Sequence, residues 1–335
     1  MTSHAVARRG MTRRCTITFA VLAAGSVAAI PRAVTAQQPY PNRPITLVVA
    51  FAAGGVADSV GRLIGQKVGE QLGQTVIVEN RAGAGGNIAA KFVAGTNPDG
   101  YTLLVTTTAL AINETLYKNK GFAAADLKPL AIVASSPESL STNPANPGDN
   151  LASFLAAKRD KPINFGTAGV GSGSHVAAEY FFKMLAKVPA THVPFQGGAP
   201  AVNAAVGNQI DLLALTLGGG VANQISGGKL KGIGVASEKR AAVTSQVPTY
   251  AEGGFANFTA ASWVGIFAPA GINAETAEKL NAVIDGIVKQ RDVNQRLQAL
   301  GFEPVQGTQA EAAKLFSDEV VAWRKMVSAI GLSID

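Results

Sequence analysis

Three glycine-rich segments hold the residues whose types and spacing could do chemistry. They are "FAAGGVAD" (51–58), "NRAGAGGN" (80–87) and "FGTAGVGSGSH" (165–175). Glycine lets a ligand approach the backbone closely, and the free N–H groups in the first turn of a helix attract anions. Such loops could therefore bind a carboxylate without a lysine. Taken singly, each is equally typical of a tight strand-to-helix turn, with Asp58 as an early acid that stabilises its helix.

The same segments fit enzymatic chemistry poorly. None has the glycine spacing of a nucleotide-binding loop, and no G-x-S-x-G nucleophile elbow occurs. Ser172 or Ser174 could act with His175 in a hydrolase, but no acid is placed to orient the histidine. We expect His175 in the first turn of a helix, donating to a ligand or a neighbouring loop, and His192 in the core. Beyond residue 36 the chain has two histidines, no cysteine and no carboxylate cluster, which predicts no metal site, and we expect no cofactor.

Hydroxyl side chains gather at two strand ends. Thr106, Thr107 and Thr108 close one apolar run, while Thr167 and Ser172 follow another. Short hydroxyl side chains in these places suit hydrogen bonds to a small polar ligand. Consecutive threonines also simply favour a β-strand, so the pattern alone leaves both interpretations open.

Residues 1–36 differ from the rest of the chain. Four arginines precede an apolar run (17–30) that ends in small residues. We interpret the segment as a secretory signal peptide cut near Ala36, because the run is shorter than the ~20 residues needed to span a bilayer. The start could equally be Met11, and the arginine pair at 13–14 leaves the general and the twin-arginine export routes open. The predicted localisation is the periplasm.

Removing this segment changes the charge and the redox chemistry of the chain. The sequence has 29 Lys+Arg and 22 Asp+Glu, but five of the basic residues and no acidic residue lie within 1–36, so the remainder carries +2. This remainder has no stripe of basic residues that would indicate nucleic-acid binding. The only cysteine, Cys15, leaves with the signal, so the mature chain has no thiol chemistry and no disulfide.

From Pro44 onward, apolar strands alternate with amphipathic helices, which is typical of mainly parallel sheets flanked by helices. We expect domain 1 to comprise 37–140 together with a return segment and C-terminal helices at 259–335, and domain 2 to comprise 141–258. Two extended segments are predicted as crossover strands between the domains. Two such connections would hinge the cleft between the domains.

The expected elements follow this alternation. In the first unit we predict strands at 45–51, 75–79 and 102–106, with helices at 56–72 and 86–94. The crossovers lie within 130–143 and 258–272. In the second unit we predict helices at 151–158, 174–185, 198–206 and 220–226, with strands at 164–166, 192–195, 212–217 and 232–236. Helices at 274–289 and 309–330 close the chain.

Several separated motifs resemble one protein family. "PYPNRPITLVVAFAAGGVAD", "LGQTVIVENRAGAGGNIAA", "INFGTAGVGSGSHVAAEYF", "HVPFQGGAPAVNAAVGNQID" and "GKLKGIGVASEKRAAVTSQVPTYAEGG" occur in the order typical of the Bug-type receptors of tripartite tricarboxylate transporters. The resemblance covers Tyr40 to Asp335. It implies a two-domain periplasmic binding protein fold, a small ligand that commonly bears a carboxylate, handover to membrane permease subunits, and no catalysis.

The resemblance also implies ligand contacts on both sides of the cleft. In domain 1 these are Phe51, Ala53, Gly54, Gly55, Ala57, Asp58, Thr106, Thr107 and Thr108. In domain 2 they are Thr167, Ala168, Gly171, Ser172, His175, Gln196 and Gly197.

Three positions depart from the family pattern. Val56 replaces a glycine, Ala57 replaces a threonine or serine, and Leu215 stands where an acid is often found. These changes remove a hydroxyl and a partner for an ammonium group. We therefore expect a carboxylate ligand with an apolar body, an aromatic acid included.

Two other functions are kept as alternatives. The chain could be a ligand sensor that presents its closed form to a signalling partner, which the sequence does not separate from transport. It could also be a secreted hydrolase that uses Ser172 with His175. A monomer is expected, because a hinged receptor needs both domains free to move.

Overall fold

The computed structural model describes residues 40–159, 161–218 and 220–335. The predicted signal peptide and its cleavage site lie outside these residues. Within the described ranges, no helix is long and apolar enough to cross a membrane. The strands form one hydrogen-bonded path, β2-β1-β3-β9-β4-β7-β5-β6, with β8 and β10 paired to β4.

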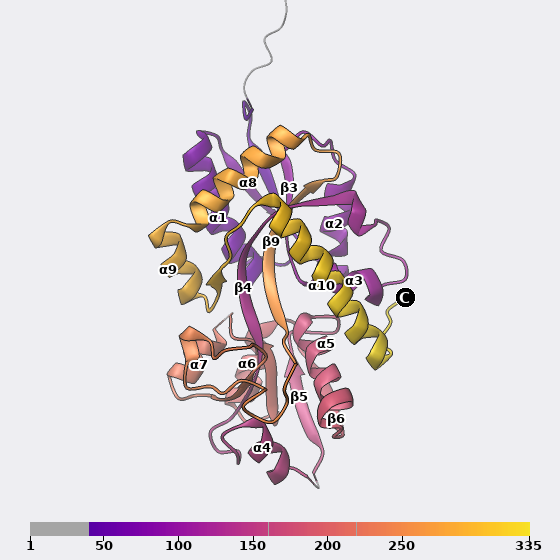
Figure 1. The fold of residues 1–335 in the computed structure, drawn as a ribbon, viewed down its shortest axis with the longest axis vertical. Helices are drawn as coiled ribbons and strands as arrows, with labels where there is room; N and C mark the ends of the chain where they lie inside the picture. Colours follow the sequence, from indigo (N-terminus) through magenta and orange to yellow (C-terminus); the bar gives the residue numbers. More distant parts are fainter. Residues whose placement is uncertain (1–39, 160, 219) are drawn as a thin grey trace, which may run out of the picture. The chain divides into compact units, whose positions relative to one another are not determined.

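The first section of this sheet is built from the N-terminal strands and one late strand. β1 (Ile45–Val49) pairs in parallel with both β2 (Val76–Asn80) and β3 (Thr102–Thr107). β9 (Ala261–Pro269) lies between β3 and β4 (Leu127–Thr142) and is antiparallel to both. Figure 1 shows β4 and β9 side by side, running from one section to the other.

The second section is organised around the far end of β4. There β4 pairs antiparallel with β7 (Leu212–Thr216) and β8 (Lys231–Val235). β5 (Ile163–Thr167) lies between β7 and β6 (Ala190–Pro194), parallel to both. Because β4 and β9 run against their neighbours, the sheets are mixed, whereas the sequence predicted mainly parallel ones.

Helices cover both sections. The first carries α1 (Val56–Leu72), α2 (Asn87–Ala94), α3 (Ala109–Leu116), α8 (Ala274–Val288), α9 (Arg291–Ala299) and α10 (Gln309–Ile330). The second carries α4 (Leu151–Ala157), α5 (Gly173–Tyr180) with a π-helical continuation Phe181–Ala186, α6 (Gly198–Val206) and α7 (Val221–Ser226). α10 packs against α3, β4 and α5, so it contacts elements of both sections.

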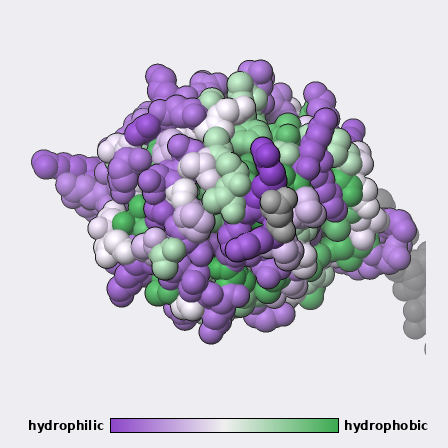
Figure 2. All heavy atoms as spheres, turned by 90° about the horizontal axis from the view of Figure 1, so that it is seen from below, coloured by the Kyte–Doolittle hydropathy of each residue, from purple (hydrophilic) through white to green (hydrophobic). Residues whose placement is uncertain are grey.

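Local sequence explains where the best-predicted helices begin and end. α1, α6 and α10 have the bounds expected from the sequence. α10 begins with a capping box, in which Thr308 and Glu311 bond to each other's backbone amides, and it ends at Gly331 with a left-handed φ of 68°. Seen from below, polar residues cover much of the surface, with apolar areas between them (Figure 2).

Two helices and one short strand were not predicted. α3 spans eight residues and its N-cap, Thr108, makes no side-chain capping bond. α9 buries only Val293 and Leu297, and β10 has two residues, Glu303–Pro304. Elements this short give at most two full turns of an apolar pattern, so tertiary packing rather than local pattern determines them.

Candidate functional site

The loop between β1 and α1 presents backbone to the surface. Ala53, Gly54 and Gly55 are exposed, while Phe51 is half-buried. The N-cap of α1 is Gly55, which has no side chain to cap the first amides of the helix. The amides of the first helical turn have no partner inside a helix, so they remain available to an anion.

The side chain of Asp58 fixes the conformation of this loop by hydrogen bonds. Its side chain accepts hydrogen bonds from Gly54 N–H (2.9 Å), Asn80 Nδ2 (2.8 Å) and Arg62 Nε (3.0 Å). Asn80 also donates to Phe51 O at 2.9 Å. Burial alone would raise the pKa of Asp58, but the bonds from Arg62, Gly54 and Asn80 outweigh it and lower the pKa to about 2. Asp58 is 3% exposed, so its placement makes it a brace of the loop.

The neighbouring predicted residues are mostly internal. Ala57 is buried in the apolar cluster beneath α1, so a hydroxyl at this position would face the core. Thr106 is buried at the end of β3, and Thr108 Oγ1 accepts a hydrogen bond from Trp263 N–H at 2.8 Å. Thr107 is half-buried. Of the three threonines, Thr107 has the side chain best placed to reach a ligand.

The loop between β5 and α5 is also fixed by its own side chains. Thr167 is fully buried; its Oγ1 lies 2.7 Å from His192 Nε2 and accepts from Gly169 N–H at 3.1 Å. Ser172 caps α5 by accepting from His175 N–H, and its hydroxyl donates to Gly169 O at 2.8 Å. The Thr167 hydroxyl, which the sequence suggested for ligand binding, is therefore engaged within the loop.

His175 lies in the first turn of α5, as expected from the sequence. Its Nδ1 accepts a hydrogen bond from Gly171 N–H at 3.1 Å, and its ring stacks on His192 at 3.9 Å between centroids. Burial, with His192 and Lys183 nearby, lowers the pKa of His175 to about 3, so the ring is neutral: Nδ1 accepts, while Nε2 carries the proton and keeps the donor that the sequence analysis expected. His192, expected in the core, also stacks on Phe165. Because the Ser172 hydroxyl and the His175 ring bond elsewhere, they do not form a nucleophile–base pair.

The loop before α6 lies against the β5–α5 loop. Gly197 N–H donates to Ala168 O at 3.1 Å, and Gln196 is exposed beside it. Leu215 borders the same place, because a Cβ on Gly198 would lie 3.6 Å from Leu215 Cδ1. An apolar side chain thus occupies the position where the resemblance suggested an acid.

The structure brings the predicted residues together within each section. Among the described residues, no hydrogen bond joins the Gly54 loop to the Gly171 or Gly197 loop. Gly171, at a left-handed φ of 80°, does approach the first section, since a Cβ there would lie 2.8 Å from Leu116 Cδ2 of α3. Only glycine fits this conformation and this contact.

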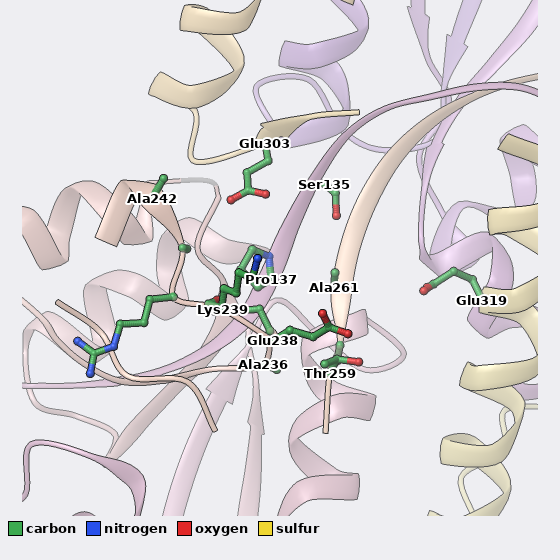
Figure 3. Close-up of a pocket in the computed structure, with 14 residues that line it drawn as sticks. Ser135, Pro137, Ala236, Glu238, Lys239, Ala242, Thr259, Ala261, Glu303 and Glu319 are labelled. Atoms are coloured by element: carbon green, nitrogen blue, oxygen red, sulfur yellow. Dashed lines mark hydrogen bonds between the residues drawn. The ribbon is translucent and has the colours of Figure 1, made fainter. Parts of the chain in front are cut away.

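A cavity of about 600 Å³ lies elsewhere, beside the crossover strands. Ser135 and Pro137 of β4, Glu303 of β10, Glu319 of α10 and the segment 236–242 contribute to its lining (Figure 3). None of the sixteen predicted ligand contacts lines it. It is an open groove rather than the predicted site.

Glu138 is a buried acid that the sequence analysis did not single out. It lies on β4, is 3% exposed, and accepts a hydrogen bond from the Ser262 hydroxyl at 2.8 Å. Burial raises its pKa to about 8, against the opposing effect of that hydrogen bond. The available signal was a lone acid within the otherwise uncharged run "LAIVASSPESLST".

The chain matches known proteins over most of its length. Residues 60–332 match the sequence profile of the tripartite tricarboxylate transporter family receptor. The chain belongs to this receptor family. Among its relatives is Protein BugT of Bordetella pertussis, 30% identical over 335 residues, which are 97% of this chain and 99% of BugT. Receptors of this family bind solutes and are not enzymes.

Solved receptors share the fold. A protein described as a periplasmic transporter superposes with a TM-score of 0.80 at 32% identity, over 88% of this chain and 100% of that one. An R. palustris protein solved with adipate has the same TM-score at 30% identity, over 88% and 99%. MatC from Rhodopseudomonas palustris, solved with malate, reaches 0.76 at 33% identity, over 86% and 100%. The chain therefore has the periplasmic binding protein fold of these receptors.

Proposed function

We propose that the mature chain, residues 37–335, binds a small organic acid in a cleft between the two sheet sections and delivers it to the permease subunits of a tripartite transporter in the membrane. The observation that carries this proposal is the exposed Gly54–Gly55 loop at the uncapped start of α1. Relatives solved with adipate and malate, both carboxylates, support it. The periplasmic location and a signal peptide cut near Ala36 belong to the same proposal.

Mechanistically, backbone amides replace the water shell of the ligand's carboxylate. The first-turn amides of α1 and the loop before α5 supply donors without an arginine clamp. The residues left facing outward are Phe51, Ala53, Gly54, Gly55, Thr107, Ala168, Ser172, Gln196 and Gly197. Asp58, Thr108, Thr167 and His175 act as braces that hold the loops.

Closure would occur by bending of β4 and β9, with domain 1 at 37–140 and 259–335 and domain 2 at 141–258. Both strands run between the sections and pair with each other. Two adjacent strands restrict the motion to a hinge, in contrast to a single flexible linker. A monomer suits this motion.

The ligand that we propose has an apolar body, an aromatic acid included. Leu215 is 7% exposed, lies in an apolar cluster, and borders the Gly197 loop. A site with this side chain lacks an anionic partner for an ammonium group. Amino acids should therefore bind more weakly than the corresponding simple acids.

A binding screen of residues 37–335 tests the function. Adipate, malate, citrate, benzoate and glutamate are compared by thermal shift and then by calorimetry. A ligand at 100 times its Kd adds about 2.7 kcal/mol of stability, which is readily measured. Binding of benzoate or adipate above glutamate is expected, and Leu215→Asp should weaken it about tenfold. Tight binding of citrate or malate without affinity for aromatic acids would refute the apolar ligand, and silence with all five acids would refute the carboxylate.

A further inference from the structure

Glu138 is a buried carboxyl group with one oxygen left over. Oε1 accepts the hydrogen bond from Ser262, whereas Oε2 is buried and has no hydrogen-bond partner. The mechanism of ligand capture described above does not use it. A buried polar atom without a partner is costly, so its place in the fold calls for a physical reason.

The carboxyl group lies against the start of α5. A Cβ on Gly173, the first residue of that helix, would lie 2.9 Å from Glu138 Oε1 and 2.8 Å from Ser262 Oγ. Gly173 directly follows Ser172, which caps the helix and closes the loop 168–172. Glu138 therefore contacts the first residue of α5, and the proposed ligand binds at the same end of this helix from the loop 168–172.

Two negative charges at one helix start repel each other strongly in a buried environment. If Glu138 is ionised, its negative charge interacts with the positive N-terminal end of the α5 dipole. If Glu138 is neutral, that end can interact with the carboxylate of the ligand instead. We propose that Glu138 is a proton-binding, positioning residue of the ligand site, which couples carboxylate binding at α5 to the binding of one proton. This inference rests on the proposed function.

The groups packed directly around Glu138 on β7 and β9 are neutral. Ser262 of β9 faces it, Thr216 of β7 lies opposite in register, and no lysine or arginine pairs with it among the described residues. Burial raises the pKa of the nearby Tyr250 well above 10. On α5, burial keeps the pKa of His175 near 3.

Of the remaining neighbours, Glu319 is the acid whose pKa is also raised. Burial lowers the pKa of His192 below 6.5. Glu179, further along α5, is paired with Lys183 at 2.7 Å. On α10, Trp323 lies near Gly173 and donates to Glu319 at 2.6 Å. Burial raises the pKa of Glu319 too, which makes it the matched control. Burial raises the pKa of Glu138 to about 8, and the comparison with Glu319 separates its change of charge from that of the second buried acid.

The experiment compares residues 37–335 with Glu138→Gln and Glu319→Gln. Calorimetry with adipate and with benzoate at pH 7, 8 and 9 gives Kd, and buffers of different ionisation enthalpy give the number of protons bound. For the wild type, Kd is expected to rise about tenfold from pH 7 to pH 9, because only the neutral form of Glu138 is competent. Glu138→Gln should bind equally well across this range, with no proton uptake, while Glu319→Gln should follow the wild type.

A ligand-free measurement separates the two proposals. Since the folded-state pKa of Glu138 is raised, its stabilising effect is present below about pH 4.5 and is lost as the pH rises to about 8. The stability of the wild type relative to Glu138→Gln should fall across that interval, and a constant difference overturns the inference without any ligand. Binding with the same pH dependence in both proteins overturns the coupling alone. No binding by either acid at pH 7 refutes the proposed function, and the coupling with it.

Discussion

The two glycine loops that precede α1 and α5 are both held by side-chain hydrogen bonds. A charged side chain holds the first loop, and neutral side chains hold the second. The first is braced by charge, because Asp58 accepts from Gly54, Asn80 and the charged Arg62. The second is braced by neutral groups, in which His175 accepts from Gly171 and lies against His192. Two loops with similar sequences therefore depend on different protonation states, an ionised Asp58 in the first and a neutral His175 in the second.

This contrast assigns different pH ranges to the two loops. The bonds that lower the pKa of Asp58 to about 2 keep the first loop braced at any pH above about 4. The second loop depends on a histidine that stays neutral and on Glu138, whose pKa burial raises to about 8. Changes of pH near neutrality should thus act on α5 and leave the start of α1 unaffected.

The largest expected effect is on the charged brace. Asp58→Ala removes the charged acceptor of Gly54 N–H, Asn80 and Arg62, and a hydrogen bond to a charged group contributes about 1.5–3 kcal/mol. We expect a loss of about 3 kcal/mol in denaturant unfolding and at least tenfold weaker acid binding. Asp318→Ala, which removes an exposed pair with Lys314, should cost less than about 0.5 kcal/mol. Equal losses in the two variants would remove Asp58 from its bracing role.

The neutral brace should respond to acid. Because the folded-state pKa of His175 is lowered, the unfolded chain gains a proton first as the pH falls below 6.5, and stability declines from there. At pH 5 this amounts to about 2 kcal/mol for His175, from 1.36 kcal/mol per pKa unit. His175→Gln should reduce the decline between pH 7 and pH 5 by that amount in denaturant titrations. An unchanged decline would show that His175 is protonated in the folded state.

The smallest expected effect concerns the contact behind α5. Gly173→Ala places a methyl group against Glu138 Oε1 and Ser262 Oγ, and overpacking of this kind costs about 1–2 kcal/mol. In a Glu138→Ala background the contact with Ser262 Oγ remains, so the same substitution should cost less without becoming neutral. The double-mutant cycle therefore expects a coupling of about 1 kcal/mol, and additive effects would contradict the packing of Glu138 against Gly173.

Much of the fold could be predicted from the sequence, because its helices carry long periodic patterns with clear ends. α1 and α10 have the predicted bounds, with glycines at their C-terminal ends. The antiparallel direction of β4 and β9 was not evident, since strand direction depends on pairing between distant segments. α3 and α9 have only eight and nine residues, too few for a repeated pattern to identify them.

The candidate site was less predictable for a related reason. Sequence placed glycines and hydroxyls at strand ends, but it did not show which hydroxyls are already engaged. Thr108 is bound by Trp263, 155 residues away, and Glu138 by Ser262, 124 residues away. Partners at such separations come from the tertiary fold, so local patterns indicate where the loops are and not which atoms remain free.

The position of β9 has a consequence for how the chain matures. This strand fills the place between β3 and β4, yet it ends only at Pro269, long after both neighbours have been synthesised. Until then the middle of the first section lacks its strand, and contacts of such long sequence separation form slowly. The sheet of the first section is therefore completed only after residue 269 has been synthesised.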